Sequence, residues 1–593
     1  MSRVLEVVLC LSQDGWPVKA SNRTRAAPRD FGAELVRAWR ICPQVRMRRG
    51  HERVTIEPCQ VVEAEPSPGA SWWTWIESHA HERRVVASRT QAFAPGVTQR
   101  ELFDAAHAGI VVSALGAVHG AAAADGTDSP PAAGGDAKLV AKSETKSAAR
   151  SAAKAAVDAS AGAGAGSGDG AQPGGGSRGR PEAAAASAAT DAPVAPQPAA
   201  APAGHWLVSE RRRGRWADDS GVVVEMTLDD IALHDGDAPP RRYVELRLAA
   251  PDWETVEARS AALRALFAAA RELSGAWPAF VQLTSAIDRA CAGQFATAAP
   301  VKAQLVDLAG IRSQRAALFA LSGDIAAQWL GNEGGVLDRD DPEFVHQMRV
   351  ALRRLRTLMR FFPRFADRQW QDTFGTDLRW LAALLGTVRD WDVFSTEILP
   401  ALIAADGGGA DWAGTLDAAR AQSAAARVEL RQALHSARYA RLTLAWLEWL
   451  STLALPPAAD DDAPSLRRHA AKRVRRLFGH LYASPSLTSL DTAARHQVRI
   501  DAKRLRYALE FFASLASRRT RTETVKTLAR VQSVLGEAND AIVALHHLEQ
   551  LAAPPYQIGF VRGYGAALEQ RAARDAEALL ASLRPPKLDG KAR

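Results

Sequence analysis

Cysteine is scarce in this sequence, and long apolar runs are missing. The 593 residues include only four cysteines, Cys10, Cys42, Cys59 and Cys291, and their spacing matches neither a zinc site nor a disulfide framework. The most apolar window, residues 110–124, is too short and too rich in alanine and glycine to span a bilayer, and the first residues lack a secretion-signal pattern. We therefore expect a cytoplasmic protein without a structural zinc ion and without a membrane partner.

Signatures of nucleotide-dependent enzymes are also missing. The chain contains no G-x-x-x-x-G-K-[ST] phosphate loop, and no dinucleotide-type glycine fingerprint follows a predicted strand. The formal net charge is +8, from 74 basic and 66 acidic residues, so the overall excess of positive charge is modest. The places where basic residues cluster therefore matter more for function than their number.

One segment, His346–Phe362, concentrates basic residues with almost no compensation. It has the sequence HQMRVALRRLRTLMRFF, and no carboxylate occurs between Glu343 and Asp367. On a helix its apolar residues fall on one side, and an arc of about 80° on the other side carries only basic side chains. That basic arc consists of His346, Arg349, Arg353, Arg356 and Arg360. Stacked like charges repel one another by roughly a few tenths of a kcal/mol per pair, so the arc is either a solvated helix face or an anion-binding surface.

The same pattern occurs a second time. His496–Phe512 has the sequence HQVRIDAKRLRYALEFF and follows the first copy at an offset of 150 residues. The same offset relates LLGTVRD, which ends at Asp390, to VLGEAND, which ends at Asp540. Because one offset links two separate motifs, we interpret the two segments as copies of a duplicated helical unit. We expect Asp390 and Asp540 to hold the basic helix of their own repeat, since buried charges are usually paired.

The repeated H-x-x-R-[VI]-x-x-[RK]-R-L-R pattern, followed each time by L-G-x-x-[RN]-D, resembles the CHAD domain, the conserved-histidine α-helical domain. The resemblance covers about residues 304–580. It implies an all-α domain of two pseudo-symmetric four-helix bundles, whose basic faces line a groove that binds inorganic polyphosphate. The second copy departs from the first at Glu510, which stands where the first copy has Arg360. We therefore expect the second basic face to be weaker at that end.

A third basic segment, residues 467–476, contains six Lys and Arg residues and no carboxylate. Together the three segments supply the residues that we expect to bind polyphosphate: His346, Arg349, Arg353, Arg354, Arg356, Arg360, Arg467, Arg468, Lys472, Arg473, Arg475, Arg476, His496, Arg499, Lys503, Arg504 and Arg506. The two repeated histidines are equally well explained as donors to an anion or as residues that fix a neighbouring helix. Since neither has an evident nucleophile or carboxylate partner in the sequence, we assign no catalytic residue.

The first half of the chain predicts a β-rich domain. Strand-like alternation occurs at Val4–Leu11, at residues 45–49 and 53–57 as a pair around a turn at Gly50, and in three segments that begin at His205, Val222 and Arg242. A helix is expected at residues 253–273. Between these parts, residues 118–204 are dominated by Ala, Gly, Ser and Pro. We expect this segment to be a disordered insertion, because such a composition cannot offset the entropy of ordering.

Three motifs in the later strands carry a second resemblance. They are R-x-x-x-W (Arg212–Trp216), V-E-x-x-L-D (Val224–Asp229) and Y-V-E-L-R-L before a long helix, and they resemble the later half of a CYTH domain. The resemblance covers residues 1–117 and 205–295. It implies an eight-stranded antiparallel tunnel that binds triphosphates, and hence an α+β chain of two domains overall. Strand alternation places Arg211, Arg213 and Arg215 on one face of their strand and Glu225, Thr227 and Asp229 on one face of the next.

The chain departs from that family at the expected metal and phosphate residues. The family's E-x-E-x-K strand is Glu6-Val-Val-Leu-Cys10 here, and Arg247 replaces the second carboxylate of the later E-x-E motif. Valine cannot coordinate Mg²⁺, and cysteine is a poor substitute for lysine among hard oxygen ligands. We therefore expect no resident metal or other cofactor. If the tunnel were active, its Mg²⁺ ligands would be Glu6, Glu225, Asp229 and Glu245.

These features predict a cytoplasmic protein, associated with polyphosphate granules, that binds inorganic polyphosphate and is not an enzyme. Two alternatives stay open: a triphosphatase that acts through the tunnel, and a protein that binds nucleic acid with the same arginines. Few aromatic residues are interleaved with the basic ones, which argues against stacking on single-stranded nucleic acid. The sequence defines neither the preferred chain length of the polyphosphate nor the oligomeric state.

Overall fold

The computed structural model of the chain describes residues 3–12, 30–63, 70–79, 82–104, 111–114, 205–236, 239–275, 277–292, 299–457, 465–483 and 486–588. The predicted disordered insertion, residues 118–204, lies outside these described residues.

All strands of the described residues belong to one antiparallel sheet. They are β1 (Val4–Leu11), β2 (Val45–Met47), β3 (Glu52–Glu63), β4 (Ala70–Ser78), β5 (Arg83–Ala94), β6 (Val97–Asp104), β7 (Val111–Ala114), β8 (His205–Ala217), β9 (Val223–Asp235), β10 (Arg241–Pro251) and β11 (Ala279–Gln282). The strands β8-β9-β10-β1-β6-β5-β4-β3 form a closed ring, because β3 also pairs with β8. The eight-stranded antiparallel barrel expected from the CYTH-like resemblance is therefore confirmed.

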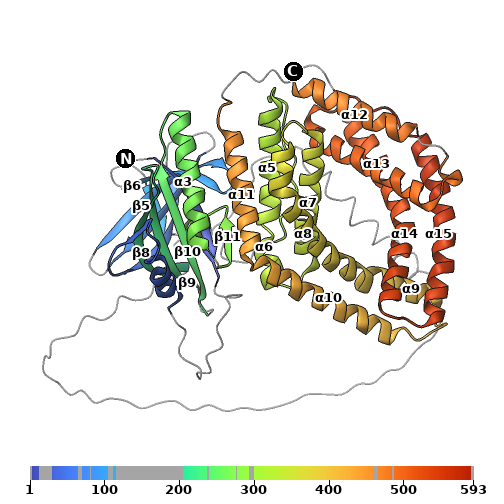
Figure 1. Cartoon of the computed structure of the whole chain (residues 1–593), viewed down its shortest axis with the longest axis horizontal. Coiled ribbons are helices and arrows are strands. Elements are labelled where there is room, and N and C mark those ends of the chain that lie inside the picture. The colour runs from blue at the N-terminus through green and yellow to red at the C-terminus, as the bar shows by residue number, and fades with distance from the viewer. Residues whose placement is uncertain are drawn as a thin grey trace, which may run out of the picture. The chain divides into compact units, whose positions relative to one another are not determined.

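Helix α3 (Val256–Ser274) covers part of the outer face of this barrel. It packs against β1, β9 and β10, and α1 (Phe31–Trp39) packs against β9 (Figure 1). Side chains alternate along each strand, so Leu5, Val7 and Leu9 of β1 are fully buried in the core that α3 completes. Burying each such side chain contributes roughly 1.5–3 kcal/mol. Apolar packing against α3 thus fixes this part of the outer face of the barrel.

The expected pairing of two strands around Gly50 is wrong. Gly50 does adopt a positive φ of 81°, as a turn requires, but β2 and β3 do not pair with each other. Instead both pair with β8, β2 through Val45 opposite Trp216 and β3 through Ile56 opposite Leu207. The longer strand β8 offers more backbone hydrogen-bonding partners than a short hairpin would. Because β8 follows the insertion in the sequence, a local pattern around Gly50 does not reveal this pairing.

A short helix, α4 (Ala286–Cys291), fills one end of the barrel interior. Its apolar side chains cluster with Trp75, Leu207 and Ile231. Side chains that are an even number of positions apart on a strand point to the same face. Leu207 lies four positions before Arg211, whose side chain is in the barrel interior, so Leu207 also faces the interior. The same argument applies to Trp75 and Ile231. The barrel is therefore closed from within at that end by its own chain.

The C-terminal part of the chain is helical. Its helices are α5 (Gln314–Leu330), α6 (Glu333–Asp338), α7 (Pro342–Phe361), α8 (Arg368–Val393), η1 (Phe394–Ile398), α9 (Leu399–Asp406), α10 (Ala413–Leu434), α11 (Ala437–Ala454), α12 (Leu466–Tyr482), η2 (Leu487–Ser489), α13 (Thr492–Phe511), η3 (Ala513–Leu515), η4 (Thr520–Thr524), α14 (Val525–Gln550) and α15 (Pro555–Ala581). No helix in this described part of the chain, or in the described barrel, has the length and apolarity needed to cross a membrane.

The two repeats correspond helix by helix. Both basic segments are helices, α7 and α13, whose bounds differ by the predicted offset of 150 residues. Each begins at an aspartate N-cap: Asp341 accepts a hydrogen bond from Glu343 N at 2.9 Å, and Asp491 accepts one from Ala494 N at 2.7 Å. In the first repeat α5 packs on α7, α7 on α8 and α8 on α10; in the second, α12 packs on α13, α13 on α14 and α14 on α15.

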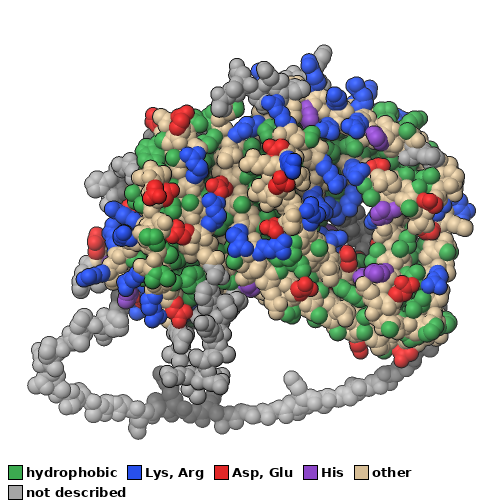
Figure 2. All heavy atoms as spheres, in the orientation of Figure 1, with side chains coloured by type: hydrophobic (Ala, Val, Ile, Leu, Met, Phe, Trp, Pro, Cys, Tyr) green, Lys and Arg blue, Asp and Glu red, His purple; other side chains and the backbone are tan. Residues whose placement is uncertain are grey.

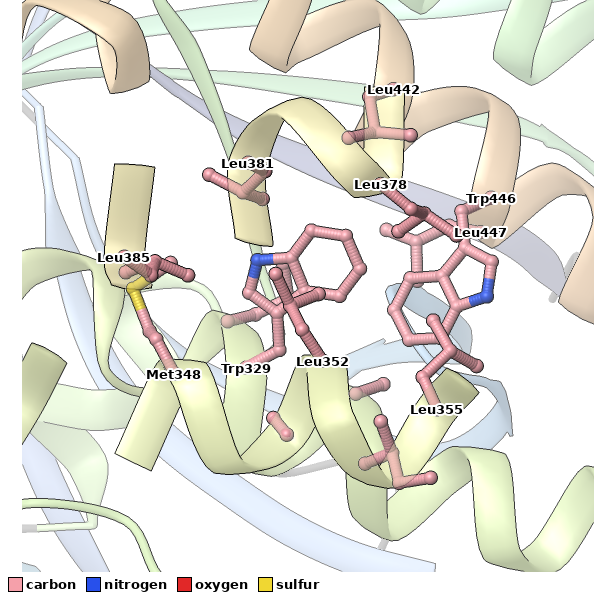
Figure 3. Close-up of a cluster of buried hydrophobic side chains, with 14 of the residues drawn as sticks. Trp329, Met348, Leu352, Leu355, Leu378, Leu381, Leu385, Leu442, Trp446 and Leu447 are labelled. Atoms are coloured by element: carbon pink, nitrogen blue, oxygen red, sulfur yellow. The ribbon is translucent and has the colours of Figure 1, made fainter. Parts of the chain in front are cut away.

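The apolar side of α7 forms the centre of the first repeat. Figure 3 shows Met348, Leu352 and Leu355 of α7 packed with Trp329 of α5 and Trp446 of α11. The two indole rings stack with their centroids 4.8 Å apart. Leu378, Leu381 and Leu385 of α8 complete this cluster.

The two repeats meet at equivalent residues. The rings of Phe361 and Phe511 lie 6.0 Å apart in an edge-to-face arrangement, and those of Phe362 and Phe512 lie 6.3 Å apart. Each pair is separated by 150 positions, so each phenylalanine contacts its own counterpart. This self-pairing is what an approximate twofold axis between the ends of α7 and α13 would produce.

Candidate anion-binding site

The orientation of α7 follows from its apolar residues. Met348, Leu352, Leu355, Met359 and Phe362, which the helical periodicity grouped on one side, are all at most 2% exposed. Their burial directs the opposite side of the helix away from the core. On that side Arg356 and Arg360 are exposed, and Arg349 and Arg353 are half-buried.

The basic sides of α7 and α13 face each other. The guanidinium of Arg353 lies 5.5 Å from the centroid of the Tyr507 ring on α13, and Arg506 lies 5.4 Å from the same ring. One aromatic ring therefore contacts a cation from each repeat. We call the group formed by Arg349, Arg353, Arg356, Arg499, Lys503 and Arg506 the basic cluster. Figure 2 shows Lys and Arg side chains gathered beside a hollow in this region of the surface.

Burial and neighbouring cations lower the pKa of Lys503 in the basic cluster. Lys503 is half-buried on α13, and burial together with Arg353, Arg499, Arg349 and Arg506 lowers its pKa to about 7. Burial also lowers the pKa of Arg349 and of Arg499. The buried Nε of Arg353 has no hydrogen-bond partner among the described residues. The cluster is thus a partly desolvated group of cations that an anion would stabilise.

Few carboxylates compensate this charge. Arg349 Nη2 lies 3.5 Å from Asp390 Oδ1, and the Asp390 side chain is 48% exposed, so the predicted pair exists as a surface contact. Burial raises the pKa of Asp540, and the charge of Arg499 lowers it, so these two groups interact electrostatically. The buried carboxylate in this part of α8 is instead Asp392, two residues after the motif, which accepts hydrogen bonds from Arg427 at 2.6 Å and from Ser423 at 2.5 Å. Asp392 therefore joins α8 to α10.

Arg354 does not lie with the other predicted binding residues. It is only 8% exposed, and its guanidinium donates to Asp324 at 2.6 Å and to Gln328 at 2.7 Å. Its counterpart Arg504 is half-buried and pairs with Asp501 at 3.0 Å, because the residue equivalent to Asp324 is Val474. Arg354 thus joins α7 to α5, and we exclude it from the basic cluster.

The end of the second basic helix is partly neutralised, as the sequence indicated. Glu510 accepts a hydrogen bond from Arg506 Nη1 at 3.0 Å, and Arg506 Nε donates to Gln532 at 3.1 Å. At the equivalent place in the first repeat, Arg360 is exposed and lies near Arg504 and Arg356, whose charges together with burial lower its pKa. The two repeats therefore present unequal positive charge.

The repeated histidines precede the arginines by one helical turn. His346 is half-buried and His496 is exposed. Each lies three residues before the first arginine of its arc, Arg349 or Arg499, so each extends the basic side of its helix toward the N-terminus.

Helix α12 carries the third basic segment. Arg468, Lys472, Arg475 and Arg476 are exposed, whereas Arg467 and Arg473 are half-buried. Burial and the charge of Arg476 on the same helix lower the pKa of Arg473. His469, which the sequence did not single out, attaches α12 to the contact between the repeats. Its ring stacks on Phe362 at 5.3 Å, and its Nε2 lies 2.7 Å from Phe361 O.

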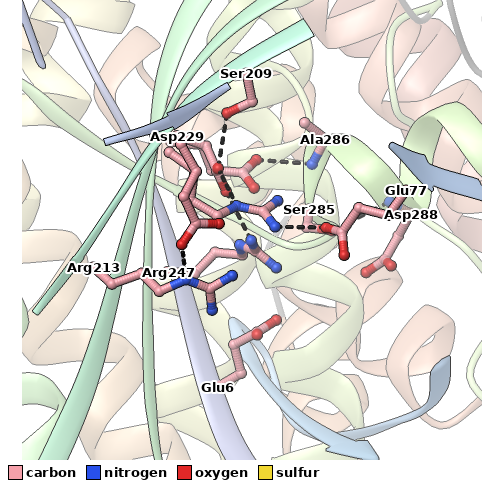
Figure 4. A network of polar contacts seen from close by, with 12 residues as sticks. Glu6, Glu77, Ser209, Arg213, Asp229, Arg247, Ser285, Ala286 and Asp288 are labelled. Atoms are coloured by element: carbon pink, nitrogen blue, oxygen red, sulfur yellow. Dashed lines mark hydrogen bonds and ion pairs between the residues drawn. The ribbon is translucent and has the colours of Figure 1, made fainter. Parts of the chain in front are cut away.

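The barrel interior contains ion pairs (Figure 4). Arg100 donates to Glu6 at 3.0 Å and to Asp288 of α4 at 3.1 and 2.5 Å. Arg211 donates to Glu77 at 2.6 Å and to Asp229 at 2.7 Å. Each interior arginine thus already has carboxylate partners from the chain itself. The predicted alternation is confirmed, because Arg211 and Arg215 of β8 lie opposite Asp229 and Glu225 of β9.

The four residues that would bind Mg²⁺ if the tunnel were active do not form a metal site. Asp229 also accepts from Arg247 at 2.7 Å, Glu245 accepts from the backbone of Ala286 at 2.8 Å, and Glu225 pairs with Arg215 at 2.8 Å near the surface. Glu6 is held by Arg100. No group of three or more His, Cys, Asp or Glu residues in the described part of the chain is arranged to hold a metal. The residues present therefore do not fit Mg²⁺.

The reason is visible in the strand register. Val8 of β1 lies directly opposite Arg247 of β10, and Cys10 lies opposite Glu245. Val8 and Arg247, the two residues that replace carboxylates of the family's motifs, are therefore neighbours. Arg247 supplies the positive charge beside Asp229 that a metal would otherwise provide.

Comparisons with known proteins identify the family of the helical part of the chain. The CHAD domain family profile matches residues 322–549. An uncharacterised protein of Mycobacterium tuberculosis, found in strains CDC 1551 / Oshkosh and ATCC 25618 / H37Rv, is 31% identical over 232 residues, which are 36% of this chain and 41% of the relative. The match thus spans less than half the length of these relatives.

Two solved structures are also similar. The CHAD domain from the plant Ricinus communis is 31% identical, and the match covers 49% of this chain and 99% of that chain with a TM-score of 0.41. PptA from Streptomyces chartreusis is 23% identical, and the match covers 44% and 98% of the two chains with a TM-score of 0.32. The matched profile includes both basic helices and both L-G motifs, and residues 322–549 of this chain are therefore a CHAD domain.

Proposed function

We propose that this protein binds inorganic polyphosphate through the basic cluster. The observation that carries the proposal is the convergence of α7 and α13, each of which places a guanidinium next to the Tyr507 ring. The charged form of Lys503, whose pKa is lowered by burial and by neighbouring arginines, is stabilised when a polyanion is bound. Charge-assisted hydrogen bonds from guanidinium groups to phosphate oxygens would supply the affinity.

The length of the basic arc favours a chain of phosphates over a single one. Arg349 and Arg360 are eleven residues apart on α7, which corresponds to about 16 Å along a helix axis. A single phosphate would contact only one turn of such a helix, whereas a linear polyanion can contact several turns at once. The exposed cations of α12 would extend the same interaction. A protein with these properties would accumulate at polyphosphate granules.

The alternative of a triphosphatase has little support in the barrel. Its interior arginines are occupied by Glu6, Glu77, Asp229 and Asp288, and one end is filled by α4. A triphosphate would have to displace buried ion pairs, which costs several kcal/mol when a charge is left without a partner.

A competition assay tests the proposed function. Fluorescently labelled long-chain polyphosphate is bound to the full chain at physiological salt, and unlabelled polyphosphate, tripolyphosphate, ATP and duplex DNA are added as competitors. We expect long polyphosphate to compete at the lowest concentration and ATP at the highest. If duplex DNA, matched in phosphate concentration, competes as well as polyphosphate, the protein is a general nucleic-acid binder and the proposal is wrong.

A further inference from the structure

Each basic helix is followed by an L-G-x-x-[RN]-D motif, at residues 385–390 on α8 and at residues 535–540 on α14. We propose that the glycine of the first motif, Gly386, is a positioning residue for polyanion binding, because it leaves the space in which Arg349 is held against α8. This inference rests on the proposed function and deepens it, since it names the residues that orient one arginine of the basic cluster before a ligand binds.

The guanidinium of Arg349 occupies the place of the missing side chain at Gly386. A Cβ atom at this position would lie 2.4 Å from Arg349 Nη1 and 3.6 Å from Arg349 Cζ. The shorter distance is well below a van der Waals contact of about 3.5 Å. Apart from the residues next to Gly386 and the α8 backbone, no other described atom comes within 4 Å of that point. The absence of a side chain at Gly386 is therefore matched to Arg349 alone.

Two other residues of the motif complete this arrangement. Leu385 is fully buried and packs beside Met348, the residue that precedes Arg349, so α7 is fixed against α8 at this point (Figure 3). Asp390 lies one helical turn after Gly386 on the same side of α8, and its Oδ1 is 3.5 Å from Arg349 Nη2. We call Gly386 and Asp390 together the arginine seat.

The arginine seat leaves Arg349 accessible to an anion. The Arg349 side chain is 33% exposed. A guanidinium has five N–H donors, and Asp390 is contacted through Nη2 at a long distance, so other donors can still bind phosphate oxygens. The charge of Arg349 also helps to lower the pKa of Lys503 on α13, so it acts across the basic cluster. Because Arg349 is already oriented, binding a polyanion loses less side-chain entropy than it would with a freely rotating arginine.

The second repeat has the same motif without the same packing. A Cβ atom at Gly536 would have no described atom within 4 Å outside its own helix and its chain neighbours, so the guanidinium of Arg499 does not lie there. The two glycines are equivalent in sequence, but only Gly386 accommodates an arginine. Gly536 therefore provides a matched control from within the same chain.

The test compares Gly386→Ala with Gly536→Ala in the full chain, by titration with labelled long-chain polyphosphate at low salt. Alanine favours a helix over glycine, and the end of the Arg349 side chain can swing outward, so both variants should melt at or above the native temperature. We expect Gly386→Ala to bind polyphosphate about threefold to tenfold more weakly, because the displaced Arg349 must then be ordered when the ligand binds. Gly536→Ala should bind as tightly as the native chain.

Two further measurements separate positioning from a general structural effect. In an Arg349→Ala background, Gly386→Ala should cause no additional loss of affinity, because the glycine acts only through that arginine. Modification of arginines by phenylglyoxal, without polyphosphate and read by peptide mass spectrometry, reports on the guanidinium itself. Arg349 should react faster in Gly386→Ala than in the native chain, whereas Arg499 should react at the native rate in Gly536→Ala.

The outcomes distinguish this role from the proposed function. If Arg349→Ala weakens polyphosphate binding and Gly386→Ala does not, the positioning role is overturned and the proposed function stands. The role is also overturned if phenylglyoxal modifies Arg349 equally fast with glycine and with alanine at position 386, or if Gly386→Ala weakens binding equally in both backgrounds. If the native chain does not bind polyphosphate, the proposed function fails and the role in binding fails with it, even where phenylglyoxal shows that the arginine seat exists.

Discussion

The guanidinium of Arg353 lies 5.5 Å from the ring of Tyr507, and this contact joins the basic helix of the first repeat to that of the second. Because Arg506 contacts the same ring, the cations of the two repeats form one group. A single repeat would present only half of it. The duplication therefore creates a cluster of cations that neither copy contains alone.

Polyphosphate affinity should fall as pH rises above neutrality. Lys503 has a pKa of about 7 in the free protein, and a bound polyanion raises that pKa toward the ordinary lysine value. Binding then takes up a proton between these two values, so the affinity decreases as pH increases from about 7 to about 9. Titrations at constant ionic strength across this range, compared with Lys503→Arg, measure the effect. The variant, whose charge does not titrate, should show a flatter profile; equal slopes would contradict the assignment to Lys503.

The equivalent arginines of the two repeats should differ in their effect on stability. Arg354→Ala leaves Asp324, whose side chain is 7% exposed, without its cation, and should cost about 3–5 kcal/mol of unfolding free energy. Arg504→Ala removes a partly exposed pair with Asp501 and should cost about 1 kcal/mol or less. Urea denaturation of the two variants compares these positions directly. Equal losses would show that Arg354 is not the structural residue we describe.

Stability should decline as pH rises from about 4.5 to about 8 because of Glu333. Burial raises the pKa of this fully buried carboxyl to about 8, although its hydrogen bond with Tyr439 opposes the shift. A group with a raised pKa in the folded state contributes stability that is fully present below its unfolded pKa and is lost as pH rises through about 8. Melting temperatures from pH 6 to about pH 9 should therefore fall less for Glu333→Gln than for the native chain. The interpretation would be wrong if the two curves ran parallel.

The barrel should neither bind Mn²⁺ nor hydrolyse tripolyphosphate. Arg247 already neutralises Asp229, and Val8 stands opposite Arg247 where a carboxylate pair would be needed. Phosphate release in the presence of Mg²⁺ or Mn²⁺ measures this, and turnover that is abolished by Glu6→Gln would contradict it. The double variant Val8→Glu, Arg247→Glu should gain a Mn²⁺-dependent increase in melting temperature, because it places two carboxylates side by side and releases Asp229.

Local patterns predicted much of this structure because they reflect periodicity. The apolar residues from Met348 to Phe362 identified the buried side of α7, and the offset of 150 residues identified α13 as its counterpart. The resemblance to known families predicted the barrel and the helical domain. The assignments that failed depend on partners distant in sequence. The strand that β2 and β3 pair with, β8, follows the insertion.

Partners distant in sequence also explain why the sequence did not predict the contacts of some arginines. Arg353 lies on the basic arc and its neighbour Arg354 does not, but the ion pair that holds Arg354 depends on the position of Asp324 on α5. Likewise, no local pattern indicates that Asp288 of α4 reaches Arg100 inside the barrel. Such pairs become evident only from the packing of elements and from strand register.

The most direct test of the account compares two triple variants for binding labelled long-chain polyphosphate at low salt: Arg349, Arg353 and Arg356 to alanine, and Arg499, Lys503 and Arg506 to alanine. A control variant, Arg368, Arg420 and Arg571 to alanine, removes three exposed cations outside the cluster, at side-chain exposures of 95%, 64% and 78%.

Each charge-assisted contact contributes about 1.5–3 kcal/mol, so the first variant should lose several kcal/mol of binding free energy. The second should lose less, since Glu510 already pairs with Arg506. The control should bind almost as well as the native chain. If both cluster variants keep full affinity while circular dichroism shows them folded, the basic cluster is only a solvated surface and the central claim is wrong.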